Sequence, residues 1–179
     1  MRIALPIIFV AALFAASSYG QKRISELRPA HAAALEQFLS TNTRYEFLSE
    51  SALEARYLRG MRGSITGGRP YYSVGDFNRD GIPDFAVVAR RKGRPRDQGA
   101  EMAKTHRYAY PLAVLIFNGA RGGKFGKPFI EDVEAPLACF IDTRIYRRKR
   151  QLHFGVFETD DIRIFTPAGK GYVVRYLEI

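Results

Sequence analysis

Short strand-like segments with short connectors fill the chain after residue 70 and constrain its fold more than any other feature. Most of the connectors are too short to hold a crossover helix, so successive strands can only pair antiparallel. The sequence therefore predicts a mainly antiparallel sheet of about six or seven strands. The predicted strand segments, all rich in Val, Ile, Tyr and Phe, are Tyr71–Val74, Phe85–Ala89, Leu112–Phe117, Leu137–Ile141, Leu152–Phe157, Ile162–Phe165 and Tyr172–Leu177.

The segment before these strands has the periodicity of helices. Apolar residues recur at steps of three and four over residues 27–39. Pro29 is tolerated only in a first helical turn, so this helix should begin between Ser25 and Pro29 and end near Ser40.

A second, shorter helix should follow. Ser51 and Glu54 have the spacing of a capping box, and Gly60 is a natural C-terminal stop. We therefore expect a helical part over residues 21–60 and a β part over residues 71–179. Helices followed by a run of strands indicate an α+β domain with two N-terminal helices packed on one face of the sheet.

The first twenty residues have the pattern of an export signal. Arg2 is their only charged residue, and residues 3–16 form an almost unbroken apolar run. A run of this length is shorter than the roughly 18 to 20 residues that span a bilayer. We expect cleavage near Gly20, which removes residues 1–20 and leaves residues 21–179 as one secreted or periplasmic domain without a membrane span.

A single cysteine, Cys139, rules out an internal disulfide. An exported domain of this size must then be held together by its core, or by its core and a metal ion. Cys139 lies in the apolar stretch 136–141 and is expected to be a buried, unreactive side chain.

The three histidines are isolated from one another in the sequence. His31 in the predicted helix and His153 in a predicted strand are expected to pack in the core, and His106 is expected to be exposed. None of them has a zinc-ligand spacing, and the chain has no Gly-x-Ser-x-Gly, phosphate-loop or dinucleotide motif. We therefore assign no catalytic residue, and a non-enzymatic role is favoured.

One segment, residues 76–84, carries a motif with a definite chemistry. Its sequence, Asp-Phe-Asn-Arg-Asp-Gly-Ile-Pro-Asp, places side-chain oxygens at positions 1, 3, 5 and 9, with glycine at position 6. Calcium takes about six to eight oxygen ligands, and alternate residues of a tightly curled loop can direct theirs inward. Magnesium fits such a pliable loop less well, because it demands a strict octahedron and loses water reluctantly. The expected calcium ligands are Asp76, Asn78, Asp80 and Asp84, with the main-chain carbonyl of Ile82.

The loop is not an EF-hand, because Val87 stands where position 12 requires glutamate and the flanking segments are strand-like. Residues 73–88 instead resemble the strand-loop-strand calcium unit of the FG-GAP and VCBS repeats, which occur in integrin-type β-propeller blades and in many exported bacterial proteins. The resemblance implies the same calcium ligands. The loop occurs only once and the Gly-Ala-Pro element of the repeat is absent, so we expect the metal hairpin but not a full β-propeller.

The net charge is +10, from 28 Lys and Arg against 18 Asp and Glu, and the basic excess lies mainly in segments 90–107 and 144–150. If both segments lie at one end of the sheet, they form a cationic surface for a polyanion such as an anionic polysaccharide. As solvated turns they would instead keep an exported protein soluble. Apart from Tyr146 in the second segment, the clusters have no interleaved aromatic residues for base stacking, which disfavours nucleic acid. The candidate anion-binding residues are Arg90, Arg91, Lys92, Arg94, Arg96, Arg147, Arg148, Lys149 and Arg150.

Three functions are compatible with these features. The favoured one is an exported calcium-binding structural or interaction module, whose partner is an extracellular or periplasmic protein or an anionic polymer. The first alternative is a secreted hydrolase of an anionic polymer, with Asp84 or His106 near the reaction. The second is a polyanion-binding protein that uses segments 90–107 and 144–150. A cleft that joins the aspartate loop to His106 and the arginines would favour the hydrolase.

Overall fold

The computed structural model describes residues 24, 26–97, 108–146 and 149–177. The helices are α2 (Pro29–Thr41), η1 (Glu50–Ala52), α3 (Ala55–Ser64) and η2 (Thr66–Gly68), of which η1 and η2 are short 3-10 helices. The strands are β1 (Tyr45–Phe47), β2 (Tyr72–Gly75), β3 (Asp84–Arg91), β4 (Arg96–Asp97), β5 (Tyr108–Phe117), β6 (Gly119–Ala120), β7 (Lys124–Phe125), β8 (Phe129–Ala135), β9 (Cys139–Tyr146), β10 (Lys149–Val156), β11 (Ile162–Ala168) and β12 (Gly171–Tyr176). The strand pairs are antiparallel, as the short connectors predicted, and strands outweigh helices.

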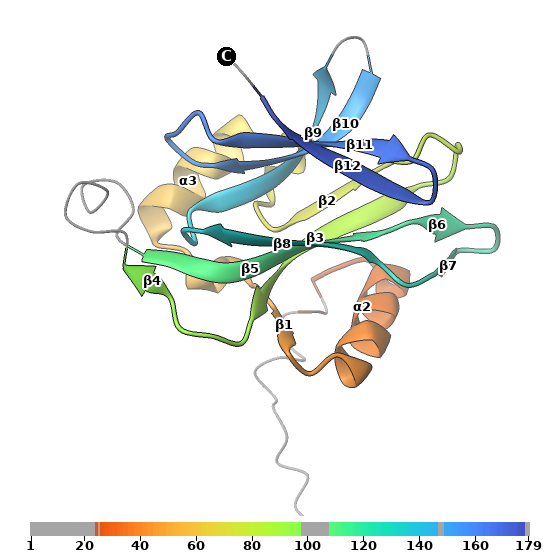
Figure 1. The fold of residues 1–179 in the computed structure, drawn as a ribbon, viewed down its shortest axis with the longest axis horizontal. Helices are drawn as coiled ribbons and strands as arrows, with labels where there is room; N and C mark the ends of the chain where they lie inside the picture. The colour runs from red at the N-terminus through yellow and green to blue at the C-terminus, as the bar shows by residue number, and fades with distance from the viewer. Residues whose placement is uncertain (1–23, 25, 98–107, 147–148, 178–179) are drawn as a thin grey trace, which may run out of the picture.

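The described strands form three sheets, whereas the sequence suggested one (Figure 1). The first sheet has the order β1-β3-β5-β4, with β2 also paired to β3 and β8 to β5, and none of the three sheets closes into a barrel. The second sheet is β12-β11-β10-β9, and β6 pairs with β7 in a small hairpin. The second sheet is separate because β9 to β12 pair in sequence order as their own meander. Contacts between β9 and the β2 region include the Ser73 and Thr143 hydroxyls, 2.8 Å apart, and no strand ladder joins the two segments.

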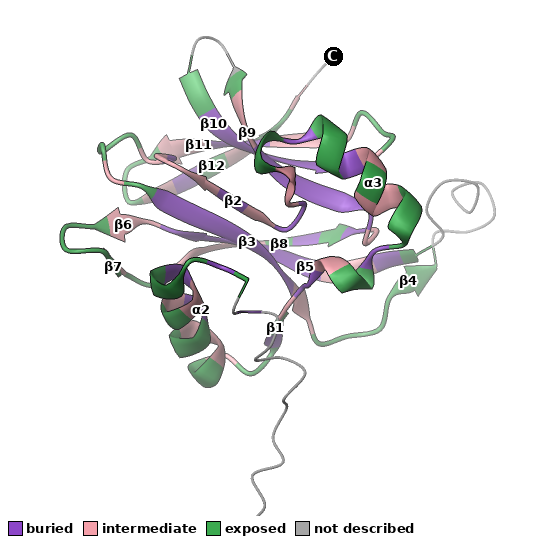
Figure 2. Ribbon diagram, turned by 180° about the vertical axis from the view of Figure 1, so that it is seen from behind, coloured by how far each residue is buried: buried purple, intermediate pink, exposed green. Residues whose placement is uncertain are grey.

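The first sheet lies between two hydrophobic clusters. Alternate residues of β3 face opposite sides, so that Phe85 and Val87 pack in the cluster that contains Leu35 of α2. Ala86 packs in the other cluster, which contains the second sheet and Met61 of α3. Figure 2 shows β3 buried along most of its length, and a strand buried on both faces has a continuous apolar sequence. The two helices therefore contribute to opposite faces of this sheet, which differs from the expected packing on one face.

The helix boundaries agree with the sequence for α2 and differ for α3. Helix α2 has the predicted start and ends one residue later than expected. Before α3, the oxygen that caps the turn belongs to Ser49, which accepts the N–H of Ser51 at 3.2 Å, and Glu54 makes no side-chain cap bond. Gly60 lies inside α3 and does not end it. Glycine is needed at position 60 because the space is too small for a side chain: a Cβ there would lie 2.7 Å from the Phe157 ring.

Three residues that the sequence placed in the core are buried. His31, Cys139 and His153 are 5%, 0% and 4% exposed. Burial raises the pKa of the Cys139 thiol to about 12, so the thiol stays protonated at neutral pH. His106 lies outside the described residues, as does the expected export signal. Among the helices that the structure describes, none combines the length and the apolar character needed to cross a bilayer.

Candidate metal centre

The aspartate loop joins two paired strands and is anchored in the core by its second residue. Strands β2 and β3 are in register up to Gly75 opposite Asp84, which closes the loop at its base. Phe77 is 1% exposed and belongs to the core cluster shared with the second sheet. The Phe77 ring lies over Gly75, where a Cβ would be 2.7 Å from it. The two predicted ligands on either side of Phe77, Asp76 and Asn78, are therefore held at a fixed place on the surface.

Three of the predicted ligands lie together on the inner side of the turn. The main-chain N–H of Asp80 donates to Oδ1 of Asp76 and to Oδ1 of Asn78, in both cases at 3.0 Å. The N–H of Gly81 donates to Oδ2 of Asp76 at 3.0 Å, and the N–H of Ile82 donates to Oδ1 of Asp80 at 2.8 Å. Gly81 has φ 82°, which glycine adopts without strain. The turn thus brings oxygens of Asp76 and Asn78 together at the Asp80 amide, and the Asp80 carboxylate is held beside them by the Ile82 N–H and by the Asn78 side-chain NH₂ group at 2.9 Å.

Asp84 has a different environment from the other aspartates. Its side chain is fully buried, and Oδ2 accepts the N–H groups of Phe77 at 2.7 Å and Asn78 at 3.1 Å. Oδ1 accepts the N–H of Gly119 at 2.8 Å. The pKa of Asp84 is raised above its usual value. Burial is the main cause and the charge of Asp80 adds to it, while the three N–H groups offset part of the rise. Asp84 therefore fastens the loop to the first residue of β6, just after β5, and only Oδ1 keeps a lone pair for a metal ion.

A link between the loop and the second sheet was not predicted from the sequence. The Tyr172 hydroxyl on β12 donates to Oδ1 of Asn118 at 2.5 Å, next to the Gly119 amide that binds Asp84. A Cβ at Gly119 would overlap the main-chain oxygen of Pro83. Burial raises the pKa of Tyr172, and the negative charges of the loop aspartates raise it further. The sequence alone does not reveal this role of Asn118 and Gly119, because Tyr172 and Asp84 are both far from them along the chain.

The donor set of the loop fits calcium. Among the described residues, no group of three or more His, Cys, Asp or Glu side chains is arranged to hold a metal ion. The candidate donors held within this turn are instead two carboxylates, Asp76 and Asp80, and one amide, Asn78. The carbonyl of Ile82 and the free lone pair of Asp84 are the further donors that the sequence predicted. Oxygen-only sets with mixed carboxylate, amide and carbonyl groups suit a hard, flexible cation such as calcium.

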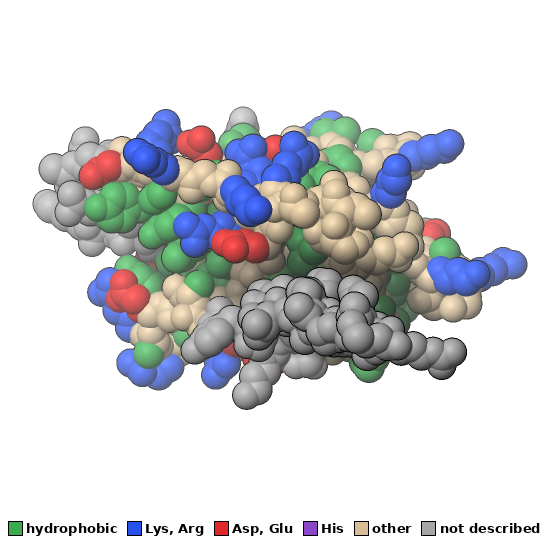
Figure 3. All heavy atoms as spheres, turned by 90° about the horizontal axis from the view of Figure 1, so that it is seen from below, with side chains coloured by type: hydrophobic (Ala, Val, Ile, Leu, Met, Phe, Trp, Pro, Cys, Tyr) green, Lys and Arg blue, Asp and Glu red, His purple; other side chains and the backbone are tan. Residues whose placement is uncertain are grey.

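The first basic segment does not form a free cationic surface in its described part. Three of its predicted anion-binding residues are paired with acidic side chains: Arg90 with Glu46 at 3.6 Å, Arg91 with Asp132 at 3.2 Å and Arg96 with Glu134 at 3.3 Å. Lys92 and Arg94 are exposed, and residues 98–107 lie outside the described part. On one face of the molecule, lysine and arginine side chains are interspersed with acidic and hydrophobic ones (Figure 3).

The second basic segment lies beside the aspartate loop. Lys149 and Arg150 line a cavity of about 400 Å³ together with Asp76 and Arg79. Arg147 and Arg148, which the sequence grouped with them, lie outside the described residues. The structure therefore brings together one predicted calcium ligand and two predicted anion-binding residues, and it adds Arg79 from within the loop.

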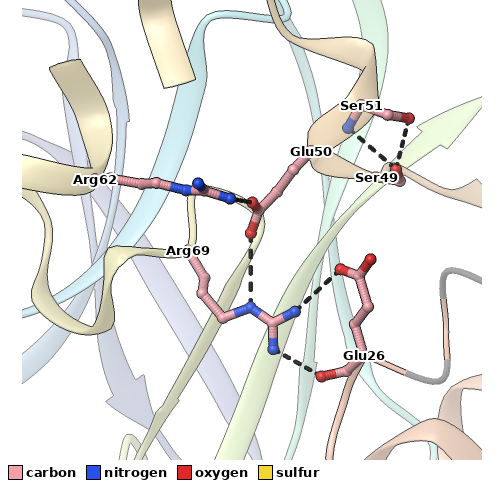
Figure 4. A network of polar contacts seen from close by, with 6 residues as sticks. All are labelled: Glu26, Ser49, Glu50, Ser51, Arg62 and Arg69. Atoms are coloured by element: carbon pink, nitrogen blue, oxygen red, sulfur yellow. Dashed lines mark hydrogen bonds and ion pairs between the residues drawn. The ribbon is translucent and has the colours of Figure 1, made fainter. Parts of the chain in front are cut away.

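A larger cavity, of about 700 Å³, lies beside η1 and α3. Its wall carries a network in which Glu50 accepts a hydrogen bond from Arg62 at 2.7 Å and forms an ion pair with Arg69 at 3.6 Å (Figure 4). Arg69 also binds the Glu26 carboxylate at 3.1 Å. Each charged group drawn in Figure 4 has a partner of opposite sign within the network, so we interpret it as a fastening between the N-terminal segment and α3.

The geometry does not support the predicted role of Asp84 in hydrolysis. Its carboxylate is buried and hydrogen-bonded to main-chain N–H groups on both oxygens, so a substrate cannot reach it without opening the loop. His106, the other candidate, lies outside the described residues.

Comparisons with known proteins add no relatives. No family model, curated protein or solved structure matches this chain. The functional interpretation therefore depends on the residues and geometry described above.

Proposed function

We propose that this protein is an exported calcium-binding structural or interaction module in which a single FG-GAP/VCBS-like hairpin holds the ion. One observation carries the proposal: main-chain N–H groups of the turn hold side-chain oxygens of Asp76, Asn78 and Asp80 within it. The proposal includes removal of residues 1–20 on export and an α+β domain that is not a full β-propeller.

Calcium would supply positive charge at a turn that carries three aspartates. Asp76 and Asp80, with Asn78 and the Ile82 carbonyl, are the residues that would hold it, and Asp84 would contribute through Oδ1. The expected consequence is added stability. Extracellular calcium modules have dissociation constants of about 10⁻⁴ to 10⁻³ M. At ten times that concentration of free calcium the folded state gains roughly 1.4 kcal/mol, which is a modest part of a total of about 5 to 15 kcal/mol.

Calorimetric titration and thermal melting test this proposal. Calcium at millimolar concentration should release or absorb heat on binding and raise the melting temperature of the parent by about 3 to 5 °C relative to chelator. Asp80→Ala should abolish both effects, because it removes a carboxylate that the turn holds through the Ile82 N–H and that is one of the proposed ligands. Asp160→Ala, in an exposed turn between β10 and β11, is the matched control and should respond to calcium as the parent does. Equal melting temperatures of the parent with calcium and with chelator, and no heat of binding, would refute the proposal.

A further inference from the structure

The cavity beside the aspartate loop has an unusual charge arrangement. Arg79, Lys149 and Arg150 are exposed side chains that line it, and no ion pair joins any of them to a carboxylate of the described residues. The cations of the other basic segment contrast with them, since Arg90, Arg91 and Arg96 are each paired with an acid. The cations around this cavity are therefore available to a ligand, unlike Arg90, Arg91 and Arg96.

The loop itself supplies the opposing charge. Asp76 is part of the cavity wall, and Asp80 and Asp84 lie in the same turn. Counted formally, three cationic side chains are balanced by three aspartates, so the neighbourhood has little net attraction for an anion. A bound calcium ion would leave an excess of two positive charges at this place. The affinity of the cavity for an anion should then depend on whether the loop is occupied.

We propose that this cavity binds the oxyanion group of an acidic sugar, and that calcium in the loop strengthens the binding. The inference rests on the proposed function, because the coupling needs calcium in the loop. A volume of about 400 Å³ is at the lower end of the range of small-ligand sites, which suits one charged sugar unit and not a large apolar ligand. Arginine side chains pair with carboxylates through two parallel hydrogen bonds, and carboxylates are also preferred calcium ligands.

The coupling must act in both directions. If calcium raises the affinity for the anion by some factor, the anion raises the affinity for calcium by the same factor. Couplings between neighbouring sites commonly amount to about fivefold or more. We expect at least about fivefold tighter anion binding with calcium than with chelator.

Titration calorimetry at low ionic strength provides the test, with digalacturonate as the acidic-sugar probe and neutral digalactose as its uncharged counterpart. Digalacturonate should bind the parent in 1 mM calcium, bind at least about fivefold more weakly in chelator, and tighten calcium binding reciprocally. Digalactose should not bind. Sodium sulfate forms a further arm: weaker binding of sulfate supports an acidic sugar, whereas equal or tighter binding overturns the choice of sugar in favour of a free inorganic oxyanion.

Two charge-matched triple variants separate the cavity from the general basic charge of the protein. Removing the cavity cations together, with Arg79→Gln, Lys149→Gln and Arg150→Gln, should abolish digalacturonate binding while calcium still binds. The control removes three exposed cations that do not line the cavity and should leave binding intact: Arg59→Gln, Lys170→Gln and Arg175→Gln.

The possible failures are distinguishable. Calcium binding without digalacturonate binding, or equal losses in both triple variants, overturns this inference and leaves the proposed function standing. Failure to bind calcium overturns the proposed function and the coupling together. Digalacturonate binding that is the same with calcium and with chelator also overturns the coupling.

Discussion

Asp84→Asn should destabilise the protein strongly even when no calcium is present. The Asp84 carboxylate accepts the N–H groups of Phe77, Asn78 and Gly119 at 2.7, 3.1 and 2.8 Å, and the residue is fully buried. Asparagine has the same shape, but one of its two oxygen positions becomes an NH₂ group. That group must face either the Gly119 N–H or the pair of N–H groups on the other side, so at least one buried donor loses its acceptor.

The magnitude follows from these contacts. A buried donor left without an acceptor costs about 1 to 3 kcal/mol, and hydrogen bonds to a charged acceptor are roughly twice as strong as neutral ones. Removing the charge also relieves repulsion from Asp80, which offsets part of this cost. The net loss should be about 2 to 4 kcal/mol in the free energy of unfolding, which corresponds to a melting temperature lower by roughly 5 to 15 °C.

Urea unfolding in chelator, followed by far-UV circular dichroism, measures this loss. Asp80→Asn is the matched control, because Asp80 is exposed and the same chemical change there should cost less than about 1 kcal/mol. The two variants should differ in chelator: Asp80→Asn keeps nearly the stability of the parent and loses most of the calcium response, whereas Asp84→Asn is destabilised both with and without calcium. A stability of Asp84→Asn within about 0.5 kcal/mol of the parent in chelator would show that the three main-chain contacts do not fasten the loop.

Two further predictions concern Gly119, beside the aspartate loop, and His31, which is buried on helix α2. Gly119→Ala should lower the free energy of unfolding by about 1 to 3 kcal/mol, because its Cβ would overlap the Pro83 carbonyl, while Gly126→Ala, which has open space, should cost little; chemical unfolding of both decides this. Burial, together with the nearby charge of Arg28, lowers the pKa of His31 to about 4 from 6.5. Because the folded-state pKa lies below the unfolded value, its contribution to stability should be lost as the pH falls from about 6.5 to 4, by at most about 3 kcal/mol. His31→Gln should therefore show a flatter dependence of stability on pH than the parent over that window, and an identical dependence would contradict the assignment.

The segments rich in branched and aromatic residues could be predicted as strands because they are buried on one or both faces. Strand β8 was missed because it alternates acidic with apolar residues: Val133 and Ala135 are buried, whereas Asp132 and Glu134 are exposed. Among the described strands it pairs with β5 alone, so its exposed side chains need not be apolar. Such a strand contains no apolar run, although the alternation of acidic and apolar residues with a period of two is visible in its sequence.

Long-range partners account for most of what the sequence left unpredicted at the site. The grouping of Arg91 and Arg96 suggested an anion-binding surface, but their acidic partners, Asp132 and Glu134, lie on β8. The pattern of candidate ligands could be predicted from the loop sequence alone, because Asp76 and Asp80 interact within the turn itself. The fastening role of Asp84 depends on Gly119, which only the pairing of β3 with β5 brings within reach.

The contact between Tyr172 and Asn118 has a consequence for the order in which the protein can acquire its structure. Synthesis proceeds from the N-terminus, so the acidic turn and Asn118 are made well before β12. The hydrogen bond from Tyr172 to Asn118 can therefore form only late. A nascent chain that stops short of β12 carries the complete acidic sequence without this support from the second sheet. Full rigidity of the turn is therefore a property of the finished polypeptide and not of the hairpin that contains it.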